Sequence, residues 1–177
     1  MPLKDRGYYL GLRREYEPEV AKLVIVAESP PASGKYFYNP TGSTNEPLFA
    51  ALAWQLGFSP ATKESGLREF QKKGWMLVDA TYRQVDKLPK DASEDRNAVI
   101  EKDHPLLLDD LSNTLSDRRT PLILIKANVC RVLEPLLTKE GFNVINGGRV
   151  IYFPSTGQQK KFEKQFADVL ESAGLRS

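Results

Sequence analysis

Hydrophobic residues gather in four short runs along the chain, at 23–27, 75–78, 122–125 and 150–153. These runs are too brief for helices and are rich in branched side chains, which is typical of the buried strands of a parallel sheet. The hydrophobic pattern therefore predicts four strands.

Segments with helical spacing lie between these runs. Asn45 can cap a helix that Pro47 begins and Gly57 ends. A second helix is predicted before the third strand, with apolar residues at Leu107, Leu111 and Leu115.

A third helix follows the third strand, over residues 129–137, and Pro135 should kink or split it. The last helix is the clearest. Its apolar stripe consists of Phe162, Phe166, Val169, Leu170 and Ala173. The sequence 156-TGQQ-159 before the stripe has the form of a capping box.

Strands that alternate with helices predict an α/β protein with three layers, in which helices cover both faces of a central, mainly parallel four-stranded sheet. We expect one domain over residues 1–177. Binding sites in such folds lie outside the carboxyl ends of the strands. This rule selects the loops 28–38, 79–89, 126–128 and 154–159, and we expect the polar stretch 87–103 to be a flexible excursion on the same side.

The composition mainly excludes classes of protein and kinds of site. The 177 residues are 41% hydrophobic, enough for one substantial core, and the net charge of +2 does not indicate a nucleic-acid binder by itself. The single cysteine, Cys130, cannot form an internal disulfide or supply a zinc or iron–sulfur site. No apolar run approaches a membrane span or signal peptide. We expect a cytoplasmic protein, a monomer by default, with no metal, cofactor or membrane partner.

The loop after the first strand contains 29-SPPASGK-35, which superficially resembles a phosphate-binding P-loop. A P-loop needs glycine at Ser29 and Ser or Thr at Tyr36, and Pro30 and Pro31 remove two backbone donors. The sequence therefore disfavours a nucleotide triphosphatase.

Two acids follow predicted strands directly. Glu28 lies at a rim of low dielectric constant, where it could orient or deprotonate a water, although it could equally cap a loop or helix. Asp79 occupies the same place on the second strand and could read a base or sugar, or form an Asx turn. Tyr36, Phe37 and Tyr38 could stack on a planar ligand, but core packing is the commoner fate of such aromatics.

The fourth loop, 153-FPSTGQQKKF-162, places a rigid proline and small polar groups before a helix with a basic first turn. Contact with an anion or a nucleic-acid backbone is one interpretation, and a capped helix with a solvated basic turn is the other. The candidate contacts to DNA are Pro154, Ser155, Thr156, Lys160 and Lys161.

Several motifs, taken in order over roughly residues 20–170, resemble those of the uracil-DNA glycosylase superfamily. The stretch 27-AESPP-31 is similar to the family's G-E-A-P-G, and 77-LVDA-80 to its L-L-N-A. Likewise, 101-EKDHPLLL-108 is similar to E-x-x-C-x-P-hydrophobic-L, 122-LILIKANVCRVL-133 to an apolar run followed by G-x-x-A and a leucine, and 153-FPSTG-157 to the lesion-inserting H-P-S-P loop.

The resemblance implies a glycosylase fold in which Glu28 positions the attacking water, Phe37 or Tyr38 stacks on an extruded base, and Asp79 reads the base edge. An Asp would prefer an edge richer in donors than the edge of uracil. Ala27 and Pro31 replace glycines, Asp79 replaces Asn, and Phe153 replaces the His that stabilises the departing base.

Loss of a preorganised electrostatic group of that kind commonly costs about 100- to 1000-fold in rate. His104 could compensate if its loop covered the site, although a lone histidine before Pro105 is more typical of a helix entry or surface. Family members with an iron–sulfur cluster use four cysteines, which this chain lacks.

Two alternatives remain open. The chain could be a noncatalytic module that binds nucleic acid or a nucleobase in the same cleft, or an enzyme acting on a nucleoside or another small planar substrate.

Overall fold

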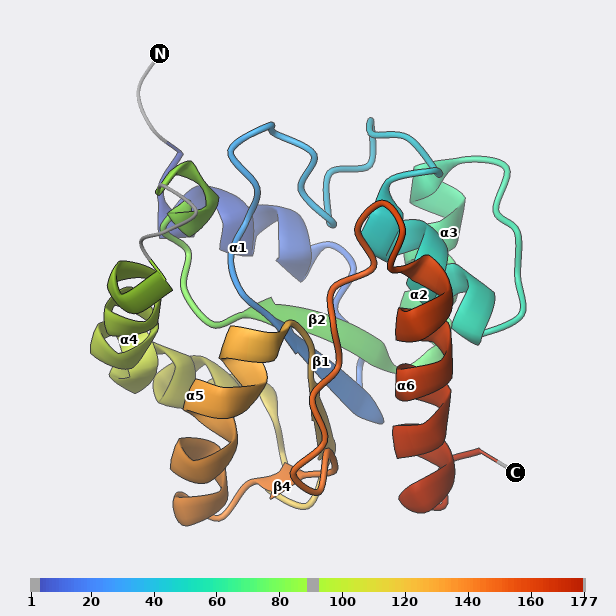
Figure 1. The fold of residues 1–177 in the computed structure, drawn as a ribbon. Coiled ribbons are helices and arrows are strands. Elements are labelled where there is room, and N and C mark those ends of the chain that lie inside the picture. Colours follow the sequence, from blue (N-terminus) through green and yellow to red (C-terminus); the bar gives the residue numbers. More distant parts are fainter. Residues whose placement is uncertain (1–3, 89–92, 177) are drawn as a thin grey trace.

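The structure is a computed structural model that describes residues 4–88 and 93–176. The elements follow in the order α1 (Arg6–Arg14), β1 (Leu23–Ala27), α2 (Pro47–Gln55), α3 (Lys63–Lys73), β2 (Trp75–Asp79), the 3₁₀ helix η1 (Val85–Lys87), α4 (Ser93–Thr114), β3 (Pro121–Leu124), α5 (Ala127–Lys139), β4 (Asn143–Val144) and α6 (Gln159–Ser172). Figure 1 shows them around one central sheet.

The sheet has four strands in the order β2-β1-β3-β4, and each neighbouring pair is parallel. In the middle of the sheet, Ile25 of β1 lies between Leu77 of β2 and Ile123 of β3. All five residues of β1 are buried, as expected for a strand with helices on both faces. The predicted α/β class with a parallel sheet is confirmed.

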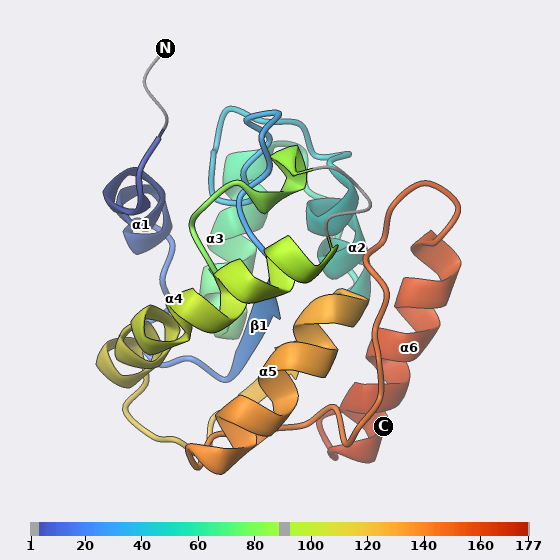
Figure 2. The same ribbon diagram turned by 60° about the vertical axis from the view of Figure 1, so that its left-hand side comes forward.

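Alternate residues of the strands feed two separate cores, because successive side chains of a strand point to opposite faces. Leu23 and Ile25 pack with residues of α2, α3, α6 and the aromatic loop after β1. Val24 and Val26 pack on the other face with residues of α4 and α5. Figure 2 shows α4 and α5 together on one side of β1, with α2, α3 and α6 beyond it.

The fourth strand does not lie where the hydrophobic run 150–153 predicted it. β4 is Asn143–Val144, and the chain then turns at 145–148. Within that turn, the side chain of Asn146 takes the place of a pairing strand: its Oδ1 accepts from the Leu124 N–H at 2.8 Å, and its Nδ2 donates to the Leu124 carbonyl at 3.0 Å. Because the outer edge of β3 is satisfied in this way, residues 150–153 pass it without joining the sheet.

The flexible excursion predicted at 87–103 is also wrong where the structure describes it. Helix α4 begins at Ser93 and contains Pro105, while residues 89–92 lie outside the described residues. Helix α5 continues through Pro135 as a single element.

The last helix begins at Gln159, two residues later than a capping box with Thr156 as its N-cap predicts. Gly157 has φ +83°, a left-handed conformation that interrupts a helical turn from Thr156. Gln158 is the N-cap without a side-chain hydrogen bond, and the Gln159 side chain instead accepts from the Gly157 N–H at 3.1 Å. In residues 4–88 and 93–176, no helix has the length and apolar character that crossing a bilayer requires.

Candidate functional site

The carboxyl ends of β1, β2 and β3 open into a cavity of about 360 Å³. This volume lies within the range of small-molecule sites. The loop after β1 and the loop before α6 lie on the same side of the sheet (Figure 1). The lining side chains that matter chemically are Glu28, Lys35, Tyr36, Phe37, Asp79, Lys126 and Phe153. Glu28, Phe37, Asp79 and the start of the fourth loop, which the sequence singled out, therefore share one cavity.

Glu28 is 5% exposed and is held from both sides by residues that follow β3. Its Oε1 lies 2.5 Å from the Lys126 ammonium, and its Oε2 accepts from the Asn128 amide at 2.6 Å. The Asn128 amide also donates to Asn97 of α4 at 3.3 Å. The side chain thus joins two neighbouring strand ends at the cavity wall and does not cap a helix.

Lys126 has an unusual backbone. It is the N-cap of α5, and its φ of +78° makes it the only non-glycine residue with positive φ in the described part of the chain. Its N–H donates to the Ile151 carbonyl at 2.8 Å, which helps to hold this conformation. Left-handed backbone at a residue with a Cβ costs roughly 1–2 kcal/mol, and such strain often accompanies functional positions.

Asp79 ends β2 and is 3% exposed. Its Oδ2 has no hydrogen-bond partner among the described residues. Burial raises the pKa of Asp79 to about 8; the nearby Arg13 guanidinium opposes this rise, and the negative charges of Asp110 and Glu28 add to it. This surrounding favours the neutral carboxylic acid over the carboxylate. The alternative Asx turn does not form, because the Thr81 N–H donates to the Glu28 carbonyl at 3.1 Å.

Behind Asp79 lies a buried ion pair that the sequence did not reveal. The Arg13 guanidinium donates to both carboxylate oxygens of Asp110, at 2.8 and 2.6 Å, and to the Tyr82 hydroxyl at 3.0 Å. The hydroxyl of Tyr82 also accepts from the Asp79 N–H at 3.4 Å. A second cavity, of about 500 Å³, lies on this side, and Asp79 belongs to the wall of both cavities.

The three consecutive aromatics have different roles. Tyr36 and Phe37 line the cavity, and the Phe37 ring also packs against Phe70 at 5.5 Å between centroids. Tyr38 is 1% exposed and absent from the cavity wall, and its hydroxyl accepts from the Leu77 N–H at 2.8 Å. The assignment of Tyr38 to base binding is therefore corrected: it is a core residue, since its ring and its hydroxyl are both engaged.

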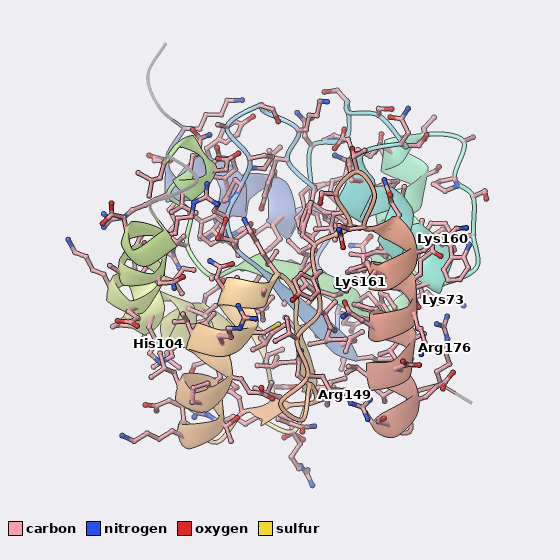
Figure 3. All side chains as sticks on the ribbon, in the orientation of Figure 1. Lys73, His104, Arg149, Lys160, Lys161 and Arg176 are labelled. Carbon is pink, nitrogen blue, oxygen red and sulfur yellow. The ribbon has the colours of Figure 1, made fainter. Side chains whose placement is uncertain are left out.

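The fourth loop divides into buried and exposed residues. Phe153 reaches the cavity, whereas Pro154 is buried and cannot form a surface contact with DNA. Ser155, Thr156, Lys160 and Lys161 are exposed. Figure 3 shows both lysines on the first turn of α6, and the Lys161 ammonium lies 3.9 Å from the centroid of the Tyr152 ring.

His104 does not take the place of the missing motif histidine. It lies within α4, is not part of the cavity wall, and has a pKa that burial lowers while Glu140 at the end of α5 raises it. Figure 3 places His104 on the α4–α5 side of the molecule, whereas Lys160 and Lys161 lie on the α6 side.

Cys130 is buried, and its thiol donates to the Leu124 carbonyl at 3.2 Å. Burial raises the pKa of this thiol to about 11, so it is not a reactive nucleophile. In the described ranges, His, Cys, Asp and Glu side chains form no group of three or more that could hold a metal ion.

A second buried ion pair supports the cavity from the side. The Lys63 ammonium, at the start of α3, donates to the Glu46 carboxylate at 2.7 Å and to the Tyr36 carbonyl at 2.6 Å. This pair ties the loop that carries Tyr36 to the starts of α2 and α3. Glu46 also lines the cavity, so the pair supports the cavity wall.

The sequence did not identify Lys126, Asn128, Lys63 or Arg13 as site residues. Lys126 and Asn128 carried a usable signal, because they follow a predicted strand as Glu28 and Asp79 do. Lys63 and Arg13 carried none, since their partners Glu46 and Asp110 lie on other elements at no regular spacing.

Comparison with protein-family models, with curated proteins and with solved structures found no match to this chain.

Proposed function

We propose that this protein hydrolyses the N-glycosidic bond of a damaged or deaminated base in nucleic acid. The observation that carries the proposal is the convergence of Glu28, Asp79 and Phe37 on one cavity at the carboxyl edge of the sheet. This reaction needs an acid that positions the attacking water, a polar group that binds the base edge, and an aromatic side chain that stacks on the base.

In the proposed reaction the target base leaves the stack and enters the cavity beside Phe37 and Asp79. A water attacks the sugar carbon and gives its proton to Glu28, while the C–N bond breaks and the base leaves with the bonding electrons. The Lys126 ammonium, 2.5 Å from Glu28, holds this carboxylate at the cavity wall and adds a positive charge to the site. That charge favours a departing anionic base, a role that Phe153 cannot fill.

The surface around the cavity suits a nucleic-acid backbone. Lys35 is exposed at the cavity wall, and Lys160 and Lys161 are exposed on the first turn of α6, next to the loop that carries Phe153. Cations placed in this way bind phosphates without reading sequence.

The test is base release from oligonucleotides that carry uracil, hypoxanthine or another lesion. We expect release by the wild-type protein and a loss of at least about 100-fold in the Glu28→Gln variant, which keeps the shape of the side chain but not its basicity. Glu64→Gln, at an exposed position of α3, is the matched control and should leave the rate unchanged. Absence of release from every substrate would contradict the proposal.

A noncatalytic binding module is the second candidate. It is favoured by the engagement of both Glu28 oxygens, with Lys126 and with Asn128, which leaves this carboxylate less free to accept a proton. Under this alternative, the same oligonucleotides bind with an affinity that falls as salt rises, and no base is released.

A further inference from the structure

The second cavity, between α1, α4 and the loop after β2, takes no part in the reaction proposed above. Its volume of about 500 Å³ exceeds the 360 Å³ of the first cavity, which holds Glu28 and Phe37, and it lies within the range of small-molecule sites. Asp79 belongs to both walls, so the two cavities adjoin at this residue. A ligand that extends beyond one base can therefore reach from one cavity into the other.

The wall of the second cavity contains an apolar surface. Leu106 of α4 is 45% exposed, and Leu107 and the ring of Tyr82 belong to the same wall. Exposed apolar surface in a cavity gains free energy when the flat or apolar face of a ligand covers it. Every nucleobase has such a face.

The same wall carries positive charge. Lys4 and Arg6 line the cavity, and neither forms an ion pair within residues 4–88 and 93–176. The Arg6 guanidinium carbon lies 5.9 Å from the centroid of the Tyr82 ring, which places this cation over another residue of the cavity wall. A cation in this place suits a phosphate.

The acids of this wall are engaged within the protein. Three of them accept hydrogen bonds: Asp5 from the backbone of α1, Asp103 from the Thr81 hydroxyl at 2.6 Å, and Asp110 from the Arg13 guanidinium. The Asp103 carboxylate also lies 3.3 Å from the Nε of Arg83. The charges left for a ligand are therefore the positive ones of Lys4 and Arg6.

We infer that the second cavity binds the nucleotide next to the target nucleotide, with its base against Leu106 and its phosphate on Arg6. The inference rests on the proposed function, which places the target base in the first cavity. The strand then runs from α1 and α4, past Asp79, towards the lysines on the first turn of α6. Helices α4 and α6 cover opposite faces of the sheet (Figure 1), so this path crosses its carboxyl edge.

A base in the second cavity has left the stack, as the target base has. In a duplex, two adjacent bases would have to leave the stack together, and each adds its own cost of unpairing and unstacking. A single strand does not pay for unpairing. The ligand that fits both cavities is therefore single-stranded nucleic acid.

The experiment measures binding of undamaged DNA by fluorescence anisotropy. The probes are a labelled oligothymidine of about ten nucleotides, its duplex with oligoadenosine, and a chain of equal length in which tetrahydrofuran replaces every base. We expect the wild-type protein to bind the single strand at least about tenfold more tightly than the duplex.

Two variants separate the contact with the base from the contact with phosphate. Leu106→Ser should bind oligothymidine about fivefold more weakly than the wild-type protein but bind the base-free chain equally well, because only the apolar contact is lost. Arg6→Gln should bind both single strands about threefold to tenfold more weakly, because both carry the phosphate.

Each variant has a matched control outside the cavity wall. Leu175→Ser changes a leucine that is 47% exposed after α6, and Arg14→Gln changes an exposed arginine in the last turn of α1. Both controls should keep the wild-type affinity for every probe.

The outcomes separate this inference from the proposed function. Equal affinity for single strand and duplex, a variant no weaker than its control, or a Leu106→Ser defect that persists on the base-free chain would each overturn the inference, whether or not base release occurs. The expected binding pattern without base release from any lesion-bearing oligonucleotide would support the inference and contradict the glycosylase function.

Discussion

At the scale of single residues, the site contains two groups in conditions that folding alone disfavours. Asp79 carries a buried oxygen that finds no partner within residues 4–88 and 93–176, and Lys126 holds a left-handed backbone. Each costs free energy, and each residue lies in the wall of the same cavity. Their coincidence at one place favours function over accident as the reason for both.

The charge state of Asp79 predicts how stability depends on pH. Its pKa is about 8 in the folded chain against an ordinary value of 3.8, so the folded chain holds the proton more tightly than the unfolded chain. The contribution of this group is therefore complete below pH 4 and is lost as the pH rises towards 8, by up to about 1.4 kcal/mol per pH unit. Urea unfolding from pH 5 to pH 8 should show this fall for the wild-type protein relative to Asp79→Asn, and parallel curves would contradict it.

The backbone of Lys126 can be tested with two substitutions that both remove the ion pair with Glu28. Lys126→Gly relieves the left-handed conformation, whereas Lys126→Ala keeps its strain. The glycine variant should therefore be the more stable of the two by about 1 kcal/mol, measured by urea unfolding. Glycine is also preferred over alanine at an unstrained N-cap, but by a smaller margin than this strain adds, so equal stability or the opposite order would show that position 126 is unstrained.

At the scale of elements, the cavity depends on contacts between segments far apart in the chain. The aromatic loop after β1 is fixed by Lys63 of α3, and α1 is fixed to α4 by Arg13 and Asp110. These pairs are buried, so breaking one leaves a charge without a partner, which costs more than the pair itself contributes.

Lys63→Met should therefore destabilise the protein by about 3–5 kcal/mol, because it leaves the buried Glu46 carboxylate unpaired. The double variant Lys63→Met, Glu46→Leu should recover part of this loss, since no buried charge remains. Both values come from chemical denaturation. A loss below about 1 kcal/mol in the single variant would show that water reaches Glu46 freely.

Much of the arrangement could be predicted from the sequence. The strands at 23–27 and 75–78 were found because they are short, apolar and rich in branched residues, and the acids that follow them were found by their position alone. The hydrophobic run at 150–153 gave a wrong strand prediction. Asn146, a polar residue, occupies the sheet edge with which that strand would have had to pair. The capping box at 156–159 gave a wrong start for the last helix, because Gly157 has a left-handed backbone conformation.

The remaining features had no local signal. Arg13 and Asp110 are 97 positions apart, and a charged residue in a helix is typical of its solvent-exposed face. Tyr38 and Phe37 are neighbours of the same chemical kind, so the sequence could not tell which one faces the cavity and which one the core.

At the scale of the whole molecule, exposed cations near the cavity should decide how nucleic acid binds. Lys160→Glu with Lys161→Glu should lower the slope of log affinity against log salt by about 2, if each lysine meets one phosphate. The matched control reverses Lys73 and Lys139, exposed lysines in the last turns of α3 and α5, and should keep the slope. Filter binding to duplex or single-stranded DNA measures both, and equal slopes would place the phosphate contacts elsewhere.

Two side chains also occupy backbone groups towards the two margins of the sheet. The Tyr38 hydroxyl occupies the backbone N–H of Leu77 on β2, at one end of the strand order, and the Asn146 amide occupies both backbone groups of Leu124 near the other end. Backbone groups left free at a sheet margin can recruit a strand from another chain, which is how aggregation and strand exchange begin. With these positions occupied by its own side chains, the sheet has fewer free backbone groups with which a strand of another copy could pair.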